Sequence, residues 1–178
     1  LDAKQKVEPG SWLCFRNVIE ISDNPQDVCL SIAADSKYWL WVNGEIQVRE
    51  GGLKRGPNPN DTYCDVIRSL PALRRGKNTI AVLVWYFGKD GFSHRNSPTP
   101  GMTFALQVNG RPIVPRRDWR VKKHPAFYLP QGPNPNYRLP ESNVGFDAAR
   151  DIPFTEASFN DRSWDKARKV SLDCAGWN

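Results

Sequence analysis

Two stretches of this sequence constrain the fold most, because both have the pattern of paired β-strands. The first, residues 35–44, ends in Asn43-Gly44, the dipeptide best suited to a type I′ hairpin turn, whose two central residues need positive φ. The second, residues 78–87, is a long β run with almost no polar interruption. Both place apolar side chains on two faces, since successive side chains of a strand point in opposite directions. Such strands need cover on both sides, so one face is predicted to meet the core and the other a loop, another domain or a ligand.

The rest of the first 125 residues is predicted to be further short strands. Seven tryptophans, fifteen prolines and the absence of a long helical period favour an all-β domain. Asn109-Gly110 is a second hairpin signal. Strands are expected at 11–17 (continuing or restarting over 18–22), 27–34, 45–48, 62–67, 102–108, 111–114 and around Trp119, with one helical turn at 69–74.

The remaining residues form a different kind of segment. Prolines interrupt it so often that long regular elements are excluded, but its many aromatic residues argue that it is packed. We therefore predict a β-sandwich domain over residues 1–125 and an irregular packed tail or linker toward the next domain over residues 126–178.

A net charge of +6 raises the question of nucleic acid binding. The positive residues are scattered apart from one cluster, which alternation would place on a solvated strand edge protected by charge. We therefore expect no nucleic-acid partner, although a basic-surface binding module stays an alternative that steep salt dependence would reveal. The cluster comprises Arg111, Arg116, Arg117, Arg120, Lys122 and Lys123.

Neither a membrane span nor a zinc site is expected. No apolar run approaches the roughly 20 residues that a spanning helix requires. The four cysteines include no Cys-x-x-Cys pair and histidine is scarce, so zinc is not predicted, and their disulfide state stays open among three full pairings. They are Cys14, Cys29, Cys64 and Cys174. The chain begins at Leu1 without Met, and we interpret it as a fragment of a longer protein.

Several motifs in order carry a family resemblance. They lie at residues 33–44, 52–57, 61–63 and 84–94, followed by 145–150 and 160–167. As a set they resemble the N-terminal β-sandwich region of bacterial α-L-rhamnosidase-like glycoside hydrolases. The resemblance implies an antiparallel jelly-roll β-sandwich of the galactose-binding-like type, export to the periplasm or cell surface, and a separate helical-barrel domain that holds the catalytic acids.

The sequence predicts no catalytic residues in this chain. Glycoside hydrolysis normally requires two carboxylates facing each other across the bond. The acidic residues here are dispersed, and no pair has a supporting motif. The parent is therefore expected to be a glycoside hydrolase, and this part alone is not expected to be catalytic.

Sugar binding is the stronger functional prediction. A sugar stacks its apolar face on an aromatic ring and offers hydroxyls to polar side chains. Two loops supply this mixture, and Trp85 is the candidate stacking platform, although core packing is the alternative for Trp85. The candidate ligand-binding residues are Asp61 and Tyr63 in one loop, Asp90, His94, Arg95 and Asn96 in the other, and Trp85.

Some of these residues have simpler interpretations. Asp90 precedes Gly91 and could be a turn residue, and His94 could bond a backbone carbonyl. Calcium would need six to eight oxygen ligands. Asp61, Asp65 and Asp90 could contribute, but no ligand spacing supports them, so neither a metal nor a cofactor is assigned.

The sequence thus predicts a non-catalytic ancillary module of an α-L-rhamnosidase-like enzyme. Its expected partners are carbohydrate, such as a rhamnose-containing glycan, and the catalytic domain of the same chain. The alternative is a purely structural module, which would dock on that domain through the apolar outer face of residues 80–87 and bind no sugar.

Overall fold

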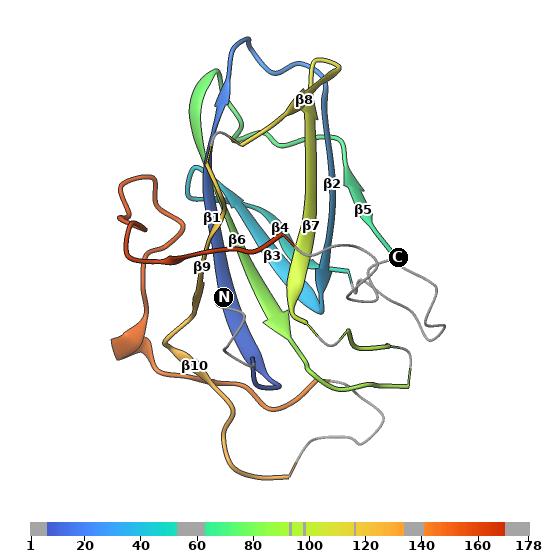
Figure 1. Ribbon diagram of the computed structural model, residues 1–178, viewed down its shortest axis with the longest axis vertical. Coiled ribbons are helices and arrows are strands. Elements are labelled where there is room, and N and C mark those ends of the chain that lie inside the picture. The colour runs from blue at the N-terminus through green and yellow to red at the C-terminus, as the bar shows by residue number, and fades with distance from the viewer. Residues whose placement is uncertain are drawn as a thin grey trace.

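The structure, a computed structural model, describes residues 7–52, 63–92, 94–97, 99–115, 117–133 and 141–169. The regular elements in this part of the chain are antiparallel strands and one short 3₁₀ helix. Two sheets pack face to face, and the C-terminal segment runs over one side of the larger sheet (Figure 1). The predicted all-β class and antiparallel jelly-roll sandwich are confirmed.

The larger sheet has six strands in the order β12-β9-β1-β6-β3-β4. Its centre is the eleven-residue pairing of β1 with β6, from Ser11 opposite Tyr86 to Ile21 opposite Gly76. Its strands are β1 (Ser11–Ile21), β3 (Lys37–Val42), β4 (Glu45–Gly51), β6 (Gly76–Tyr86), β9 (Arg120–Lys123) and β12 (Asp165–Lys166).

The smaller sheet has four strands in the order β5-β2-β7-β8. They are β2 (Val28–Asp35), β5 (Asp65–Ile67), β7 (Gly101–Val108) and β8 (Arg111–Ile113). A separate two-stranded sheet pairs β10 (Phe127–Tyr128) with β11 (Gly145–Phe146), and a 3₁₀ helix follows at Ala148–Arg150.

Both predicted hairpin turns are confirmed. Asn43 and Gly44 have φ of 53° and 85°, and Asn109 and Gly110 have φ of 51° and 72°. The amide of Asn43 fixes the first turn, because its Nδ2 donates to the carbonyl of Ala72 and its Oδ1 accepts from the backbone N–H of Thr79.

Alternation along β3 and β6 divides the apolar side chains between two clusters. The inner cluster fills the space between the sheets and includes Tyr38, Leu40, Val82 and Val84, all without solvent exposure. The outer cluster lies on the other face of the six-stranded sheet and is aromatic. There Trp12 stacks between Trp85 and Phe127, with ring centroids 4.8 and 4.1 Å away.

The cover of the outer face comes from the chain's own C-terminal segment. Phe154 and Trp164 are 4% and 5% exposed within the outer cluster. The backbone of Ala167 bonds the carbonyl of Trp119, and β12 pairs with β9. The outer face of β6 is therefore buried by a segment of the same chain, and the alternative in which residues 80–87 dock on another domain through that face is wrong.

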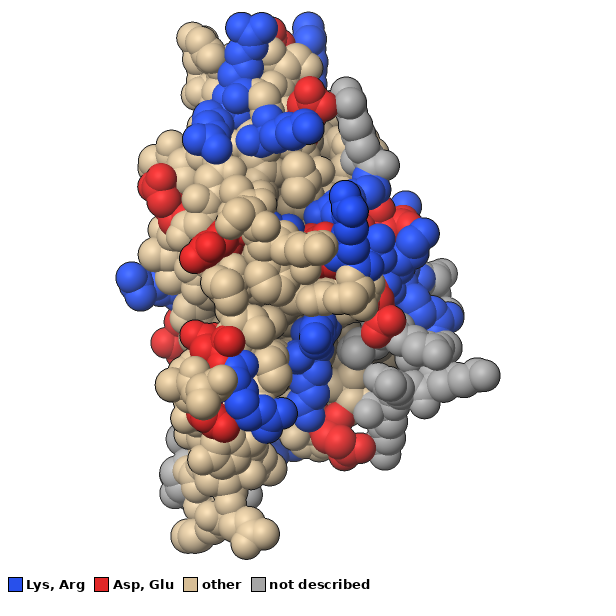
Figure 2. Space-filling model, turned by 90° about the vertical axis from the view of Figure 1, so that its left-hand side faces the viewer, with Lys and Arg blue, Asp and Glu red and all other residues tan. Residues whose placement is uncertain are grey.

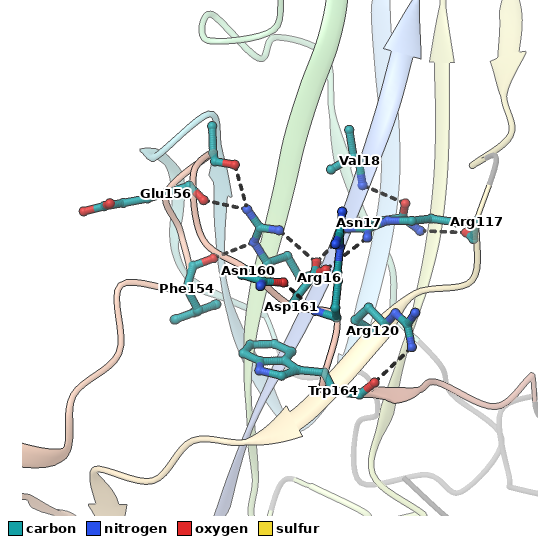
Figure 3. A network of polar contacts seen from close by, with 12 residues as sticks. Arg16, Asn17, Val18, Arg117, Arg120, Phe154, Glu156, Asn160, Asp161 and Trp164 are labelled. Atoms are coloured by element: carbon teal, nitrogen blue, oxygen red, sulfur yellow. Dashed lines mark hydrogen bonds and ion pairs between the residues drawn. The ribbon is translucent and has the colours of Figure 1, made fainter.

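A buried arginine fastens this segment to β1 (Figure 3). Arg16 is 2% exposed, and its Nε donates to the carbonyl of Phe154 at 2.9 Å while Nη2 donates to that of Glu156 at 2.5 Å. Its Nη1 lies 2.8 Å from Oδ2 of Asp161. Arg117 donates to both oxygens of the same carboxylate, at 3.0 and 2.7 Å. Every charge in this network thus meets an opposite charge or a carbonyl, as buried ions require.

These contacts change the interpretation of the basic cluster. The predicted solvated edge at β9 is covered by β12, and Arg117 and Arg120 are engaged with Asp161 and with the carbonyl of Trp164. Arg116 lies outside the described residues. On the side of the molecule in Figure 2, basic groups are interspersed with acidic groups and with uncharged surface.

Two smaller predictions are only partly right. Residues 69–74 form a turn closed by the N–H of Leu73 on the carbonyl of Leu70, where one helical turn was predicted. The predicted packing of the tail holds for Phe154 and Trp164, but Tyr128 and Phe146 are 53% and 48% exposed.

The three described cysteines, Cys14, Cys29 and Cys64, are free thiols, and Cys174 lies outside the described residues. Among the residues that the structure describes, no helix is long and apolar enough to cross a membrane.

Candidate functional site

The predicted sugar-binding loop, residues 88–100, lies just beyond β6 and is held by a buried carboxylate. Asp35, at the end of β2, has no solvent exposure. It accepts hydrogen bonds from the hydroxyl of Ser36 at 2.9 Å, from the backbone N–H of Ser97 at 2.7 Å and from the hydroxyl of Ser97. Ser36 in turn accepts from the N–H of Phe87 at 3.1 Å. Both ends of the loop are therefore tied to the junction between β2 and β3.

His94 lies inside this anchor. Its ring has no solvent exposure, its Nε2 is 3.7 Å from Oδ1 of Asp35, and it meets the ring of Phe87 edge-on at 5.6 Å. Its carbonyl accepts from the N–H of Gly91 at 2.9 Å. His94 thus supports the loop from inside the protein, and its buried ring is not available to a ligand.

Serine, histidine and aspartate are the residues of a hydrolytic triad, but their arrangement here is different. In a triad the serine hydroxyl bonds the imidazole, which takes its proton. The hydroxyls of Ser36 and Ser97 both donate to Asp35, and the whole group is buried. The geometry of Ser36 and Ser97 is that of an anchor.

Asp90 and Arg95 form the polar surface of the loop. The carboxylate of Asp90 accepts from the N–H of Asn96 at 2.8 Å and from Nη1 of Arg95 at 3.0 Å, and both charged side chains are about half exposed. The bond from Asn96, aided by Arg95, lowers the pKa of Asp90 below its ordinary value. Asp90 is therefore a permanent anion at neutral pH.

The side chains of Asn96 and Tyr86 bond each other and the backbone of the loop. The amide of Asn96 donates to the carbonyl of Ser97 at 2.7 Å and to the hydroxyl of Tyr86 at 3.3 Å. That hydroxyl donates to the same carbonyl at 3.0 Å, and burial raises the pKa of Tyr86. The loop consequently keeps its shape through internal bonds.

Phe92 stands out at the tip of this loop. Its side chain is 84% exposed, two residues from Asp90 and three from Arg95. The sequence placed Phe92 in the candidate sugar-binding loop, but it was not among the residues predicted to contact the ligand. An exposed ring in the same loop as an ion pair combines the apolar surface and the polar groups that a sugar contacts.

The other predicted residues lie apart from this group. Trp85 belongs to the buried outer cluster, and its indole Nε1 is buried without a hydrogen-bond partner among the described residues. Tyr63 is 55% exposed and lies just before β5, in the smaller sheet. Asp61 lies outside the described residues. The structure therefore brings Asp90, Arg95 and Asn96 together and buries His94 and Trp85. Because Asp61 is outside the described residues, the structure does not show whether the two predicted loops form one site.

Two small pockets lie at the opposite end of the sandwich. The larger, of about 150 Å³, is lined by Pro25, Arg68 and Leu70 among others. The smaller, of about 50 Å³, holds the single carboxylate of Asp23. Neither offers the facing pair of carboxylates that glycoside hydrolysis uses. In the described ranges, no three His, Cys, Asp or Glu residues are grouped so that they could hold a metal.

Comparison with known proteins connects this fold with rhamnosidases. No family model matches the chain, and no curated protein does. Among solved structures, it is similar to a GH78 family rhamnosidase of Bacillus sp. GL1, with a TM-score of 0.75 and 26% identity over 96% of this chain. It is also similar to an α-L-rhamnosidase from Aspergillus terreus, with a TM-score of 0.70 and 19% identity over 96% of this chain.

The matched regions are small parts of those proteins. This chain spans 18% of the Bacillus protein and 20% of the Aspergillus protein. The Aspergillus protein is only 19% identical to this chain, so that comparison establishes the fold alone. The Bacillus protein is 26% identical and is therefore similar in sequence as well as in fold. The family resemblance seen in the sequence is confirmed: the chain is similar to one segment of GH78 α-L-rhamnosidases.

Proposed function

We propose that this chain is a non-catalytic ancillary module of an α-L-rhamnosidase-like glycoside hydrolase and that it contacts carbohydrate. The observation that carries the first part is the match over 96% of this chain to 18% of a GH78 rhamnosidase. In this proposal the catalytic acids belong to another domain of the same polypeptide, and the enzyme is exported by a bacterium.

The carbohydrate contact is assigned to Phe92, Asp90 and Arg95. The ring would stack on the apolar face of a sugar, and the two charged groups would bond its hydroxyls, since charge-assisted hydrogen bonds are the stronger ones. The loop is already fixed by Asp35 and Asn96, so binding would cost little ordering entropy. A rhamnose-containing glycan is the proposed ligand because the similar proteins are rhamnosidases.

Calorimetric titration tests this proposal. The isolated module is titrated with L-rhamnose and α-L-rhamnosyl oligosaccharides, with and without calcium. Saturable heat is expected, and Phe92→Ala should weaken affinity by about fivefold, the equivalent of an aromatic contact of about 1 kcal/mol.

Phe146→Ala is the matched control, because Phe146 is also an exposed phenylalanine but lies on β11. Its affinity should equal that of the wild type. The loop assignment fails if Phe92→Ala and Asp90→Ala bind as tightly as the wild type, and the carbohydrate proposal fails if no sugar gives heat.

A scaffold without sugar binding is the second candidate, and an exposed apolar patch favours it. Tyr128, Leu129, Val144 and Phe146 are between 41% and 53% exposed. They belong to β10, β11 and the residues beside them. β10 lies at the lower left in Figure 1, and the lower end of that side is largely uncharged in Figure 2.

The two candidates differ in one comparison. If the patch docks on a neighbouring domain, Phe146→Ser should lower the unfolding temperature of a hydrolase that carries the module by more than it lowers that of the isolated module. An equal effect in both proteins would count against docking.

A further inference from the structure

His124 lies where the sandwich passes into its C-terminal cover. It follows β9 directly, and its backbone N–H donates to the carbonyl of Trp12 at 2.8 Å. The side chain is 3% exposed. Its ring packs against three aromatic rings of the cover: Phe127 at 4.9 Å, Phe154 at 5.7 Å and Phe146 at 6.4 Å between centroids.

The hydrogen bonds of His124 specify a neutral ring. Its Nδ1 accepts from the backbone N–H of Ala126 at 3.2 Å. Nδ1 therefore carries no proton, and the proton of the neutral ring is on Nε2, which lies 3.4 Å from Oδ1 of Asp151. An imidazolium has two donors and no acceptor. A second proton, on Nδ1, would point at the buried N–H of Ala126 and break that bond.

We propose that His124 is an acid-sensitive latch, whose neutral ring holds residues 126–133 and 141–154 on the aromatic face of the six-stranded sheet and whose protonation at Nδ1 releases them. The bond that opens lies at the entrance to the cover. The N–H of Asp147 bonds the carbonyl of Ala126 at 2.9 Å, so β11 and the 3₁₀ helix would be loosened together with β10. The strands of the sandwich keep their own pairing. This device does not depend on the proposed carbohydrate contact.

The charges around the ring decide the pH range. In the described part of the chain, Asp151 is the charged group facing the ring from the cover, and the other ring contacts, Phe127, Phe146 and Phe154, are uncharged. On its own strand the ring follows Lys122 and Lys123, both exposed.

Burial lowers the pKa of His124, and Asp151 opposes this only in part, so the net direction is down from the ordinary value of 6.5. The unfolded or released state then binds the proton more tightly than the closed state. The closed state therefore loses stability as the pH falls from about 6.5 through the lower pKa, and it is unaffected above that range.

Two measurements test the latch. The chain has two histidines, so imidazole NMR signals are easily assigned with His124→Gln and His94→Gln variants. The signal of His124 is expected to titrate below pH 6.5. Amide hydrogen exchange should show the protection factors of Ala126 and Asp147 falling by about tenfold or more between about pH 7.5 and about pH 5, while those of β6 stay constant.

The variants separate this latch from general acid instability. Gln at position 124 can accept from Ala126 and donate to Asp151, so His124→Gln should remove the pH dependence of exchange. His94→Gln should retain it. Asp151→Asn should lower the pKa of His124 further, since the carboxylate raises it.

The proposal is overturned if the His124 signal titrates at or above pH 6.5, or if His124→Gln shows the same fall in protection as the wild type. The titration of the wild-type protein is decisive even where a variant fails to fold.

Discussion

Removing the carboxylate of Asp161 should weaken this protein more than any single change on its surface. The side chain is 4% exposed and accepts three charge-assisted hydrogen bonds, one from Arg16 and two from Arg117. In Asp161→Ala the guanidinium of Arg16, which is 2% exposed, would stay buried with carbonyl partners but without a counter-charge. Breaking a buried ion pair from one side costs about 3–5 kcal/mol.

That loss can be measured in two assays. Urea unfolding followed by circular dichroism should give a free energy of unfolding lower by about 3–5 kcal/mol. A chain of this length loses about 2–4 °C per kcal/mol, so the unfolding temperature should fall by about 6–20 °C. Limited proteolysis should cut the variant first within residues 151–169, because Arg16 bonds the carbonyls of Phe154 and Glu156 in that segment.

Asp118→Ala is the matched control. Asp118 pairs with Lys166 at 3.1 Å, but both side chains are more than half exposed. A surface pair of this kind contributes about 0–1 kcal/mol. If Asp161→Ala also stays within about 1 kcal/mol of the wild type, the buried network does not hold the C-terminal cover on the six-stranded sheet, and the reasoning from its contacts is refuted.

The same network predicts a dependence on acid. Burial alone would raise the pKa of Asp161, but the bonds from Arg117 and Arg16 outweigh it and lower the pKa below the ordinary value. The pKa is therefore lower in the folded state than in the unfolded state. The stabilisation is complete above about pH 4 and is lost as the pH falls through the folded pKa. Asp161→Asn should remove this part of the acid sensitivity.

Three further changes test other contacts. Tyr38→Phe removes a hydrogen bond of 2.6 Å to Oδ2 of Asp65, and it should lower the free energy of unfolding by about 1.5–3 kcal/mol in urea titrations; an unchanged midpoint would contradict the role of that bond. Gly145→Ala would place a Cβ 2.4 Å from Cζ of Tyr128, and it should cost about 1–3 kcal/mol through overpacking; the double variant with Tyr128→Ala should recover most of the loss. Burial, with the charge of Asp151, raises the pKa of the Cys14 thiol well above its ordinary value, so a thiol reagent should label exposed Cys64 in the native protein and Cys14 only on unfolding; rapid native labelling of Cys14 would contradict the packing of the outer cluster.

The strands could be predicted because their signals are local. Alternation along residues 38–42 and 80–87 separated the inner and outer clusters correctly, and both Asn-Gly turns were where the sequence placed them. The cover of the outer face could not be predicted in the same way. It is attached by Arg16 to backbone carbonyls about 140 residues away, and carbonyls leave no trace in a sequence pattern.

The loop after β6 was also only partly predictable from the sequence. Its polar composition led us to predict sugar-binding residues there, and the structure shows that Asp90 bonds Arg95 and Asn96. The inward position of His94 depends on Asp35, which lies at the end of β2 and has no solvent exposure. A buried carboxylate that anchors Ser97 from 62 residues away is a tertiary feature, and only the fold reveals it.

Contact between the module and carbohydrate through the loop at Phe92 is tested most directly by mapping it residue by residue. Backbone amide NMR spectra of the module would be recorded during titration with an α-L-rhamnosyl oligosaccharide. We expect saturable shifts concentrated at residues 90–97, with β8 and the pockets at the other end of the sandwich unchanged. Shifts confined to another surface, or no shifts at millimolar sugar, would contradict the proposed contact.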